Sequence, residues 1–385
     1  MASTVSMAAP ATAPARLPGI DSLRGALACS VMLYHYLTWA SIGVGTVLDR
    51  TFAAIGLYAV EAFFVISGMS LGFAYRHSDL RGRDALTTFG IRRFFRIAPL
   101  FYLVLAATLA LKGAAIYLLR DRTLSMPGAG ELLGNLTLLF GVWDPSASLV
   151  IAGWSIGIEM TFYLLFPALA WLFRREDFRP AAFFCAASAI VAAVFATGLI
   201  HDGLSAAEQW PIYVNVANHL PFFLAGMLLA KGAAATAPLT RRTADGLLVM
   251  SAALFILLSA ATPTETAFVC GWRRAAFGLL TIGLVWTVSR RPESESRLTD
   301  LGRKLGDDSY AIYLTHFLHF TVWRQVLPRS QPLLVVVVAL VSTVVTSRYV
   351  FRWIETPMIA IGKQVARRLT ARRTSQITNG IRRAA

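Results

Sequence analysis

The chain has 385 residues, of which 56% are hydrophobic and only 15% are charged. Soluble domains carry about 25% charged residues, so this composition excludes a soluble globular protein and indicates an integral membrane protein. The formal net charge of +15 would suit a nucleic-acid-binding protein. The basic residues lie between apolar stretches rather than on one polar face, however, and this distribution excludes that class.

The first 19 residues are rich in alanine and proline and have no short apolar core before a cleavage site. They are therefore predicted to be a disordered cytoplasmic tail rather than a signal peptide. Residues 20–358 are predicted to form one membrane domain, and residues 359–385 to form a basic cytoplasmic tail.

Apolar windows of about 20 residues predict an all-α, polytopic membrane helix bundle with about ten transmembrane helices. The predicted spans cover residues 22–43, 52–75, 94–118, 151–173, 180–200, 212–231, 245–262, 268–289, 306–327 and 332–352. A further apolar segment, 131–143, is too short to cross a bilayer and is predicted to be interfacial or re-entrant.

Loop charges predict how these spans are oriented. The loops that follow even-numbered spans are rich in arginine, whereas the opposite loops hold few basic residues: Arg50, Arg120, Arg122 and Arg329. Because cytoplasmic loops carry an excess of lysine and arginine, both termini are predicted to lie in the cytoplasm.

One ionisable side chain occupies the middle of the first predicted span. His35 follows Arg24 by eleven residues, which along a helix places it roughly 16 Å deeper, near the centre of a hydrocarbon core about 30 Å thick. A titratable group at that depth is a functional candidate by default. A neutral imidazole can take a proton from a hydroxyl or thiol, so His35 is predicted to be a general base.

Other polar side chains reach a similar depth in other predicted spans. Glu61, Glu159 and His316 lie roughly 12–15 Å from the ends of spans two, four and nine, so they are predicted to share a layer with His35. Structural alternatives stay open: Glu61 pairs with an arginine or accepts a backbone hydrogen bond, and His316 is a buried structural histidine. His219 is predicted to be structural.

Two groups of arginines are candidates for anion binding. The first lies at the cytoplasmic face and consists of Arg24, Arg92, Arg93 and Arg96. Its members also act as topology determinants, but guanidinium groups in such a cluster suit phosphate or diphosphate recognition. Arg273 and Arg274, near the opposite face, either extend to the membrane interface or hold an anionic group.

The sequence has no Walker loop, no G-x-G-x-x-G fingerprint and no metal-ligand spacing, and its three cysteines lie apart in apolar stretches. It therefore supports neither nucleotide hydrolysis nor dehydrogenation, and it predicts no metal and no permanently bound cofactor.

Six sequence blocks, in order over about residues 19–358, resemble the acyltransferase 3 family of bacterial integral-membrane O-acyltransferases. They are an Arg-x10-His pattern formed by Arg24 and His35, Phe-Phe-Val-Ile-Ser-Gly at 63–68, the basic block at 92–99, Trp-Ser-x-x-x-Glu at 154–159, the block at 305–316 that contains Tyr313 and His316, and Glu-x-Pro at 355–357. One such block would be weak evidence, whereas six in order are specific.

The resemblance implies transfer of an acyl group, commonly acetyl, from cytoplasmic acyl-CoA to a hydroxyl of a glycan such as an exopolysaccharide, a lipopolysaccharide or a lipid-linked sugar. It implies a multi-pass protein of the bacterial inner membrane, whose partners are acyl-CoA, the acceptor and the lipid bilayer. A proton-coupled transporter or glycan flippase that uses the same buried His and Glu residues is the alternative.

Roles for the candidate residues follow from this interpretation. His35 is expected to be the general base, and Glu159 or Glu61 to orient it or the acceptor hydroxyl. The anionic part of coenzyme A is expected to bind Arg24, Arg92, Arg93 and Arg96. Substrate contacts are expected from Tyr313, His316, Arg273 and Arg274.

Overall fold

The computed structural model describes residues 18–384 except residues 119, 202, 234–236, 293–295 and 329, and it describes only the backbone of Pro18, Ala206 and residues 372–384. Residues 1–17 of the predicted N-terminal tail, and Arg329, lie outside the described residues.

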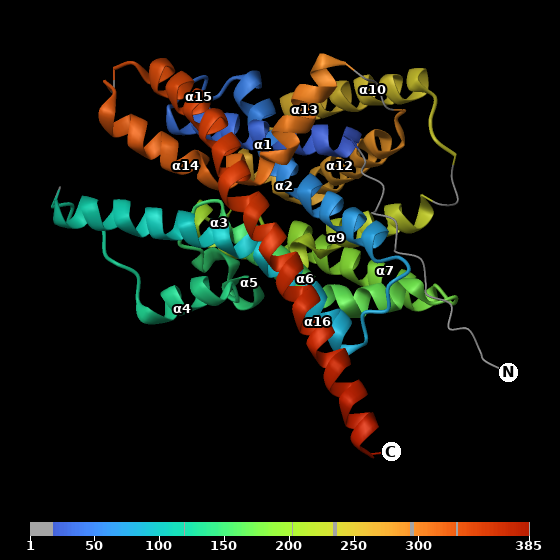
Figure 1. The fold of residues 1–385 in the computed structure, drawn as a ribbon. Coiled ribbons are helices and arrows are strands. Elements are labelled where there is room, and N and C mark those ends of the chain that lie inside the picture. The colour runs from blue at the N-terminus through green and yellow to red at the C-terminus, as the bar shows by residue number, and fades with distance from the viewer. Residues whose placement is uncertain are drawn as a thin grey trace.

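The prediction of an all-α bundle is confirmed, because the described residues form helices and no strand (Figure 1). The longer helices are α1 (Pro18–Trp39), α2 (Val47–Ala74), α3 (Arg83–Tyr117), α6 (Gly153–Arg174), α7 (Arg179–Val194), α9 (Val216–Gly232), α10 (Arg241–Ala260), α12 (Gly271–Arg290), α13 (Arg297–Asp307), α14 (Ser309–Val326), α15 (Pro332–Val350) and α16 (Thr356–Ala384). The shorter elements are α4 (Ala129–Thr137), α5 (Phe140–Trp143), η1 (Pro145–Ala147), η2 (Phe195–Leu199), α8 (Ala206–Tyr213), α11 (Glu265–Val269) and η3 (Phe351–Glu355).

Within the described residues, seven helical segments are long and apolar enough to cross a membrane. They are Val47–Ala74, Arg83–Tyr117, Gly153–Arg174, Arg179–Leu199, Ala207–Gly232, Arg241–Ala260 and Pro332–Ala371. Each contains one of the predicted spans or most of it. The other three predicted spans fall on α1, α12 and α14, helices of 22, 20 and 18 residues. These three helices carry His35, Arg274 and His316, and such polar side chains lower the hydropathy of the helices that hold them.

Two predicted boundaries shift for local reasons. The first span ends at Trp39 rather than at residue 43, because Ser41 adopts a left-handed φ of 54° and the Ile42 N–H bonds back to the Leu37 carbonyl oxygen at 2.9 Å, which closes the helix. The segment 131–143 forms two short helices, α4 and α5, which are separated where Leu138 takes a left-handed conformation. This break agrees with the prediction that the segment is too short to span.

Close contact between α2 and α9 forms the centre of the bundle. A Cβ atom on Gly68 would lie 2.0 Å from the carbonyl oxygen of Phe223, and one on Gly226 would lie 2.0 Å from that of Val65. Only glycine lets two helix backbones approach so closely. Helix α2 also packs against α1 and α12, while α1 packs against α13 and α14.

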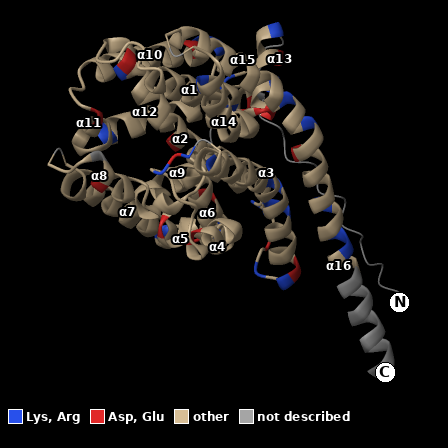
Figure 2. Ribbon diagram, turned by 90° about the vertical axis from the view of Figure 1, so that its left-hand side faces the viewer, with Lys and Arg blue, Asp and Glu red and all other residues tan. Residues whose placement is uncertain are grey.

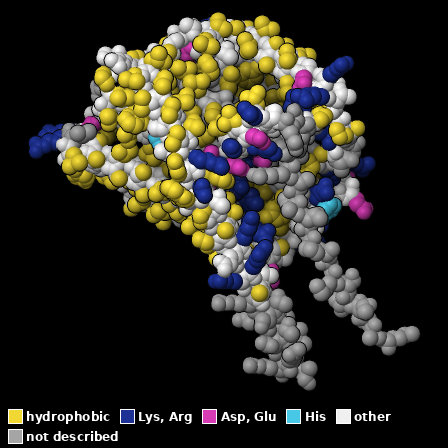
Figure 3. Space-filling view, turned by 45° about the horizontal axis from the view of Figure 1, so that its top comes forward, with side chains coloured by type: hydrophobic (Ala, Val, Ile, Leu, Met, Phe, Trp, Pro, Cys, Tyr) yellow, Lys and Arg dark blue, Asp and Glu magenta, His cyan; other side chains and the backbone are white. Residues whose placement is uncertain are grey.

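Helix α16 lies across α3 and then runs beyond the rest of the bundle (Figure 1). Gly362 faces the ring of Phe95 at this crossing. Basic residues of α3 and α16 lie on the same side of the molecule (Figure 2). A space-filling view shows a mostly hydrophobic face with lysines and arginines gathered in one area (Figure 3). This separation of charge is typical of a membrane protein with one basic face.

Candidate active site

A cavity of about 370 Å³ opens among α1, α2, α3, α6 and α14, and arginines from two helices line it. Arg24 comes from α1, and Arg93 and Arg96 come from α3, where a spacing of three residues puts them on one helix face. The Nε atoms of Arg24 and Arg93 are buried and have no hydrogen-bond partner among the described residues. Unsatisfied guanidinium donors in a cavity favour an anionic ligand.

Acidic and hydroxyl groups share this cavity with the arginines. The Tyr163 hydroxyl donates a hydrogen bond to Glu159 Oε1, one turn earlier on α6, and the Ser67 hydroxyl donates to the same oxygen at 3.1 Å. Glu159 and Asp21 lie within electrostatic range of Arg24. The cavity is therefore polar at its arginine end and is lined by one carboxylate that two hydroxyl groups hold in place.

His35 lies beside His316 rather than beside a carboxylate. The Nδ1 atom of His35 is 2.9 Å from the Nε2 atom of His316, and the two imidazole planes lie within 7° of each other. The indole of Trp39 lies nearly parallel to His35, with ring centroids 4.9 Å apart. Tyr36 donates a hydrogen bond of 2.7 Å to the carbonyl oxygen of His316 and so ties α1 to α14.

Tyr313 connects the histidine pair to the cavity. Its hydroxyl lies 2.7 Å from the Ser155 hydroxyl, and both residues line the cavity. Its carbonyl oxygen accepts a hydrogen bond of 2.7 Å from His316 Nδ1. His35 and His316 do not line the cavity. Tyr313, which does, lies between the cavity and the histidine pair.

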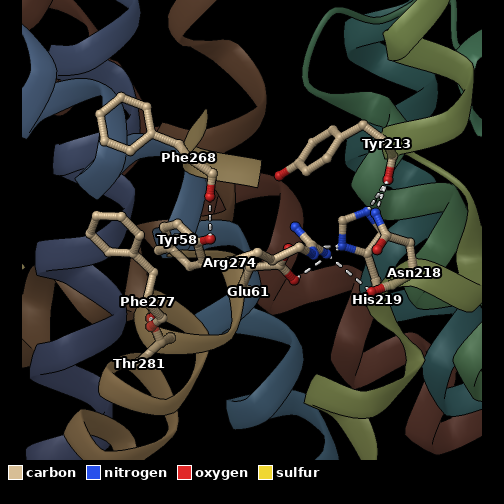
Figure 4. Close-up of polar contacts among 9 residues, drawn as sticks. All are labelled: Tyr58, Glu61, Tyr213, Asn218, His219, Phe268, Arg274, Phe277 and Thr281. Carbon is tan, nitrogen blue, oxygen red and sulfur yellow. Dashed lines mark hydrogen bonds and ion pairs between the residues drawn. The ribbon is translucent and has the colours of Figure 1, made fainter. Parts of the chain in front are cut away.

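The four residues predicted to share one layer (His35, Glu61, Glu159 and His316) lie in separate clusters. Glu61 is buried away from His35, with both of its carboxylate oxygens 3.0 Å from His219 Nδ1 (Figure 4). Arg274 lies 3.4 Å from Glu61 Oε1 and donates a hydrogen bond of 3.1 Å to the Asn218 carbonyl. His219 Nε2 completes this network at 2.7 Å from the Tyr213 carbonyl.

The rotation of α2 explains why Glu61 leaves the site. Val60, Phe64, Ser67 and Leu71 recur every three or four residues among the α2 side chains that line the cavity. Glu61 is rotated by about 100° from Val60, lies outside the lining face, and contacts His219 on α9 and Arg274 on α12. The sequence left open that Glu61 pairs with an arginine, and in the structure Glu61 does pair with Arg274. Among the described contacts, neither Glu61 nor Glu159 hydrogen-bonds His35.

The predicted anion-binding arginines also separate. Arg92 is exposed and does not line the cavity, whereas Arg93 and Arg96 do. Arg273 lies over the Trp272 ring, 5.0 Å from its centroid, and Arg274 is buried against Glu61. The group formed by Arg24, Arg92, Arg93 and Arg96 thus contributes three of its four members to the cavity, and the Arg273/Arg274 pair contributes none.

Sequence reasoning missed several residues that line or adjoin the site. Ser67, Ser155 and Tyr163 lay inside or directly beside the recognised blocks, but no spacing argument singled them out. Glu355, in the closing Glu-x-Pro block, is buried within electrostatic range of Arg96 and Arg24. The signal in the sequence for Glu355 was its place in the Glu-x-Pro block at 355–357.

Comparison with known proteins adds independent information. The model of the acyltransferase 3 family, described as an acyltransferase domain, matches residues 17–352. Acyltransferase MdmB of Streptomyces mycarofaciens is 30% identical over 327 residues, which is 79% of each chain. No solved structure matches.

Two further relatives match parts of longer proteins or parts of this chain. Peptidoglycan O-acetyltransferase OatA of Listeria monocytogenes is 24% identical over 368 residues, which is 89% of this chain and 56% of that protein. Nodulation protein 10 of Rhizobium leguminosarum bv. viciae is 31% identical over 198 residues, 46% of this chain and 48% of that one.

Proposed function

This chain belongs to the acyltransferase 3 family and is an O-acyltransferase, and from that premise we propose that it moves an acetyl group from cytoplasmic acyl-CoA to a hydroxyl of a glycan. One observation carries the proposal. One cavity is lined by Arg24, Arg93 and Arg96 and also by Tyr313. The Tyr313 carbonyl oxygen accepts a hydrogen bond from His316, which in turn contacts His35.

The arginine end of the cavity suits the donor. Guanidinium groups bind phosphate oxygens through two parallel hydrogen bonds, and coenzyme A carries its phosphates at one end and its thioester at the other. With the phosphates at Arg93 and Arg96, the pantetheine arm extends past Glu159 toward Tyr313. We propose that the thioester carbonyl reaches His35 there after a side-chain movement of Tyr313 or Phe63, two cavity-lining aromatic residues whose ring centroids lie 6.0 Å apart.

The proposed reaction is direct acyl transfer with His35 as general base. His35 takes the proton of the acceptor hydroxyl while the hydroxyl oxygen attacks the thioester carbonyl carbon. The carbon–sulfur bond then breaks, the coenzyme A thiolate leaves, and the proton passes from His35 to the sulfur. The products are the acyl ester of the acceptor and free coenzyme A thiol.

One relative supports an acceptor with sugar hydroxyls, because OatA, which is 24% identical to this chain, is named for peptidoglycan. We propose an exopolysaccharide, a lipopolysaccharide or a lipid-linked sugar as the acceptor, with the enzyme in the bacterial inner membrane and both termini cytoplasmic.

The test is acyl transfer by the purified full-length protein in vesicles, with radiolabelled acetyl-CoA and an envelope glycan fraction as acceptor. We expect label in the glycan and an equal amount of free thiol, and we expect His35→Gln to lose both. Full transfer by His35→Gln would refute the general-base assignment. In a parallel assay with glycan labelled in its sugar, movement of the glycan across the vesicle membrane without release of thiol would instead identify a transporter.

A further inference from the structure

His316 is a fully buried residue on α14 whose two ring nitrogens both contact hydrogen-bonding partners. Its Nδ1 atom lies 2.7 Å from the Tyr313 carbonyl oxygen, and its Nε2 atom lies 2.9 Å from His35 Nδ1. On the backbone side, its own carbonyl oxygen accepts the Tyr36 hydrogen bond. The ring is therefore held on both edges and cannot turn without losing a buried hydrogen bond.

These partners determine where the protons are. A carbonyl oxygen only accepts hydrogen bonds, so the proton of neutral His316 must sit on Nδ1. Its Nε2 atom then carries a lone pair and accepts, which means that His35 donates from Nδ1. Neutral His35 is consequently left with its lone pair on Nε2, the atom that has no hydrogen-bond partner within the described part of the chain.

We propose that His316 is a positioning residue that fixes His35 in its Nδ1-protonated tautomer and so directs the basic Nε2 atom to the acceptor. The proposal rests on the proposed function, in which Nε2 takes the acceptor proton. His316 is not among the residues that line the cavity. Its Nε2 atom also stabilises the imidazolium that forms on His35 during the reaction, because the hydrogen bond from Nδ1 strengthens when the ring becomes charged.

The fold supplies the means to keep this pair aligned. Tyr36, one residue after His35, contacts both the His316 carbonyl oxygen and, at 2.7 Å, the Thr343 hydroxyl on α15. The Trp39 ring lies nearly parallel to both imidazoles, at 4.9 Å from His35 and 5.9 Å from His316. Packing and hydrogen bonds from three helices thus restrict the two rings to one arrangement.

His319 offers a matched control on the same helix. Its Nδ1 atom lies 3.1 Å from the Thr315 carbonyl oxygen and its Nε2 atom lies 2.8 Å from the Thr346 hydroxyl, so it also joins α14 to α15. It has no contact with His35 among the described interactions. Replacing it removes a partly buried hydrogen bond between two helices and leaves the hydrogen bond between His316 and His35 in place.

The experiment compares His316→Leu, His316→Gln and His319→Leu in the purified full-length protein. Removing the acceptor in His316→Leu is expected to lower kcat by about 100-fold or more while the KM for acetyl-CoA stays unchanged, since general-base catalysis is worth roughly 10²- to 10⁴-fold. The glutamine oxygen accepts the His35 hydrogen bond, so His316→Gln is expected to recover kcat to within about tenfold of native. His319→Leu is expected to keep native kcat.

A second measurement reads the tautomer directly. Nitrogen-15 chemical shifts of histidine-labelled protein should show His35 protonated on Nδ1 in the native chain and as a mixture of tautomers in His316→Leu. A native His35 protonated on Nε2 would overturn the proposal whatever the activity of the variants. So would a His316→Leu enzyme with native kcat. If the native protein transfers no acyl group, the proposed function fails instead, and the shifts still decide the tautomer.

Discussion

Neighbouring arginines at the entry to α3 have different surroundings although they share one motif. Arg93 and Arg96 line the cavity, while Arg92 is exposed outside it. Each residue of a helix is rotated by about 100° from the one before, so adjacent residues cannot share a face. Binding of a phosphate-bearing donor should therefore depend on some of these arginines and not on others.

Replacing Arg96 by alanine is expected to raise the KM for acetyl-CoA about tenfold or more and to leave kcat nearly unchanged. The reason is that a charge-assisted hydrogen bond to phosphate contributes roughly 1.5–3 kcal/mol and is made away from the reacting carbonyl. Steady-state kinetics of Arg96→Ala beside Arg92→Ala provide the measurement and its control. Equal increases in KM for both variants would show that the two arginines act only through overall charge.

At the scale of elements, the crossing of α2 and α9 depends on glycines with no room for a side chain. Gly68 and Gly226 face backbone carbonyl oxygens of the partner helix, and a backbone atom cannot move aside as a flexible side chain can. This crossing holds both the cavity-lining face of α2 and Glu61 in position. Its stability is therefore a condition for the site.

Gly226→Ala is expected to destabilise the protein by about 1–3 kcal/mol through overpacking, despite the better helix propensity of alanine. Gly246→Ala on α10 is the control, because a Cβ atom there meets nothing within 4 Å. That variant is expected to gain up to about 1 kcal/mol. The midpoint of thermal unfolding in detergent measures both, and an unchanged midpoint for Gly226→Ala would show that α9 can shift freely.

The Glu61–His219–Arg274 cluster joins α2, α9 and α12 inside the bundle (Figure 4). Glu61→Gln should leave the Arg274 charge buried without its counter-charge, at a cost of about 3–5 kcal/mol. We expect a lower unfolding midpoint with native kcat per folded molecule. The double variant Glu61→Leu/Arg274→Met should recover part of the loss. A large fall in kcat of Glu61→Gln at native stability would instead support the catalytic role first predicted for Glu61.

At the scale of the whole molecule, basic residues from different helices gather on one side. Basic residues of α3 and α16 lie on one side, and large parts of the surface are hydrophobic (Figures 2 and 3). Because positively charged segments stay in the cytoplasm, this side should face inward and receive acyl-CoA.

A reporter fused after residue 385 tests the orientation. Green fluorescent protein at this position is expected to fluoresce in bacterial cells, and alkaline phosphatase is expected to be inactive there, since the first folds in the cytoplasm and the second requires an oxidising compartment. Fusions after residue 123, in the loop that follows α3, are expected to give the opposite pair of results. An active phosphatase at the C-terminus would place the arginine-lined cavity on the wrong side for a cytoplasmic donor.

The sequence by itself determined the family and where most of the helices lie. Helix positions depend on local hydrophobicity, which is readable within 20 residues. It also placed Arg93 and Arg96 on one face, because helical periodicity sets which near neighbours lie together.

Only the tertiary structure decided the partners of the buried polar groups. His35 and His316 are 281 positions apart, and Glu61 is separated from Arg274 by 213. Helical depth placed Glu61, Glu159, His35 and His316 at similar levels, but depth says nothing about the direction in which each helix face points. That direction is set by how the helices rotate to pack against one another, a property of the whole bundle that no single segment contains.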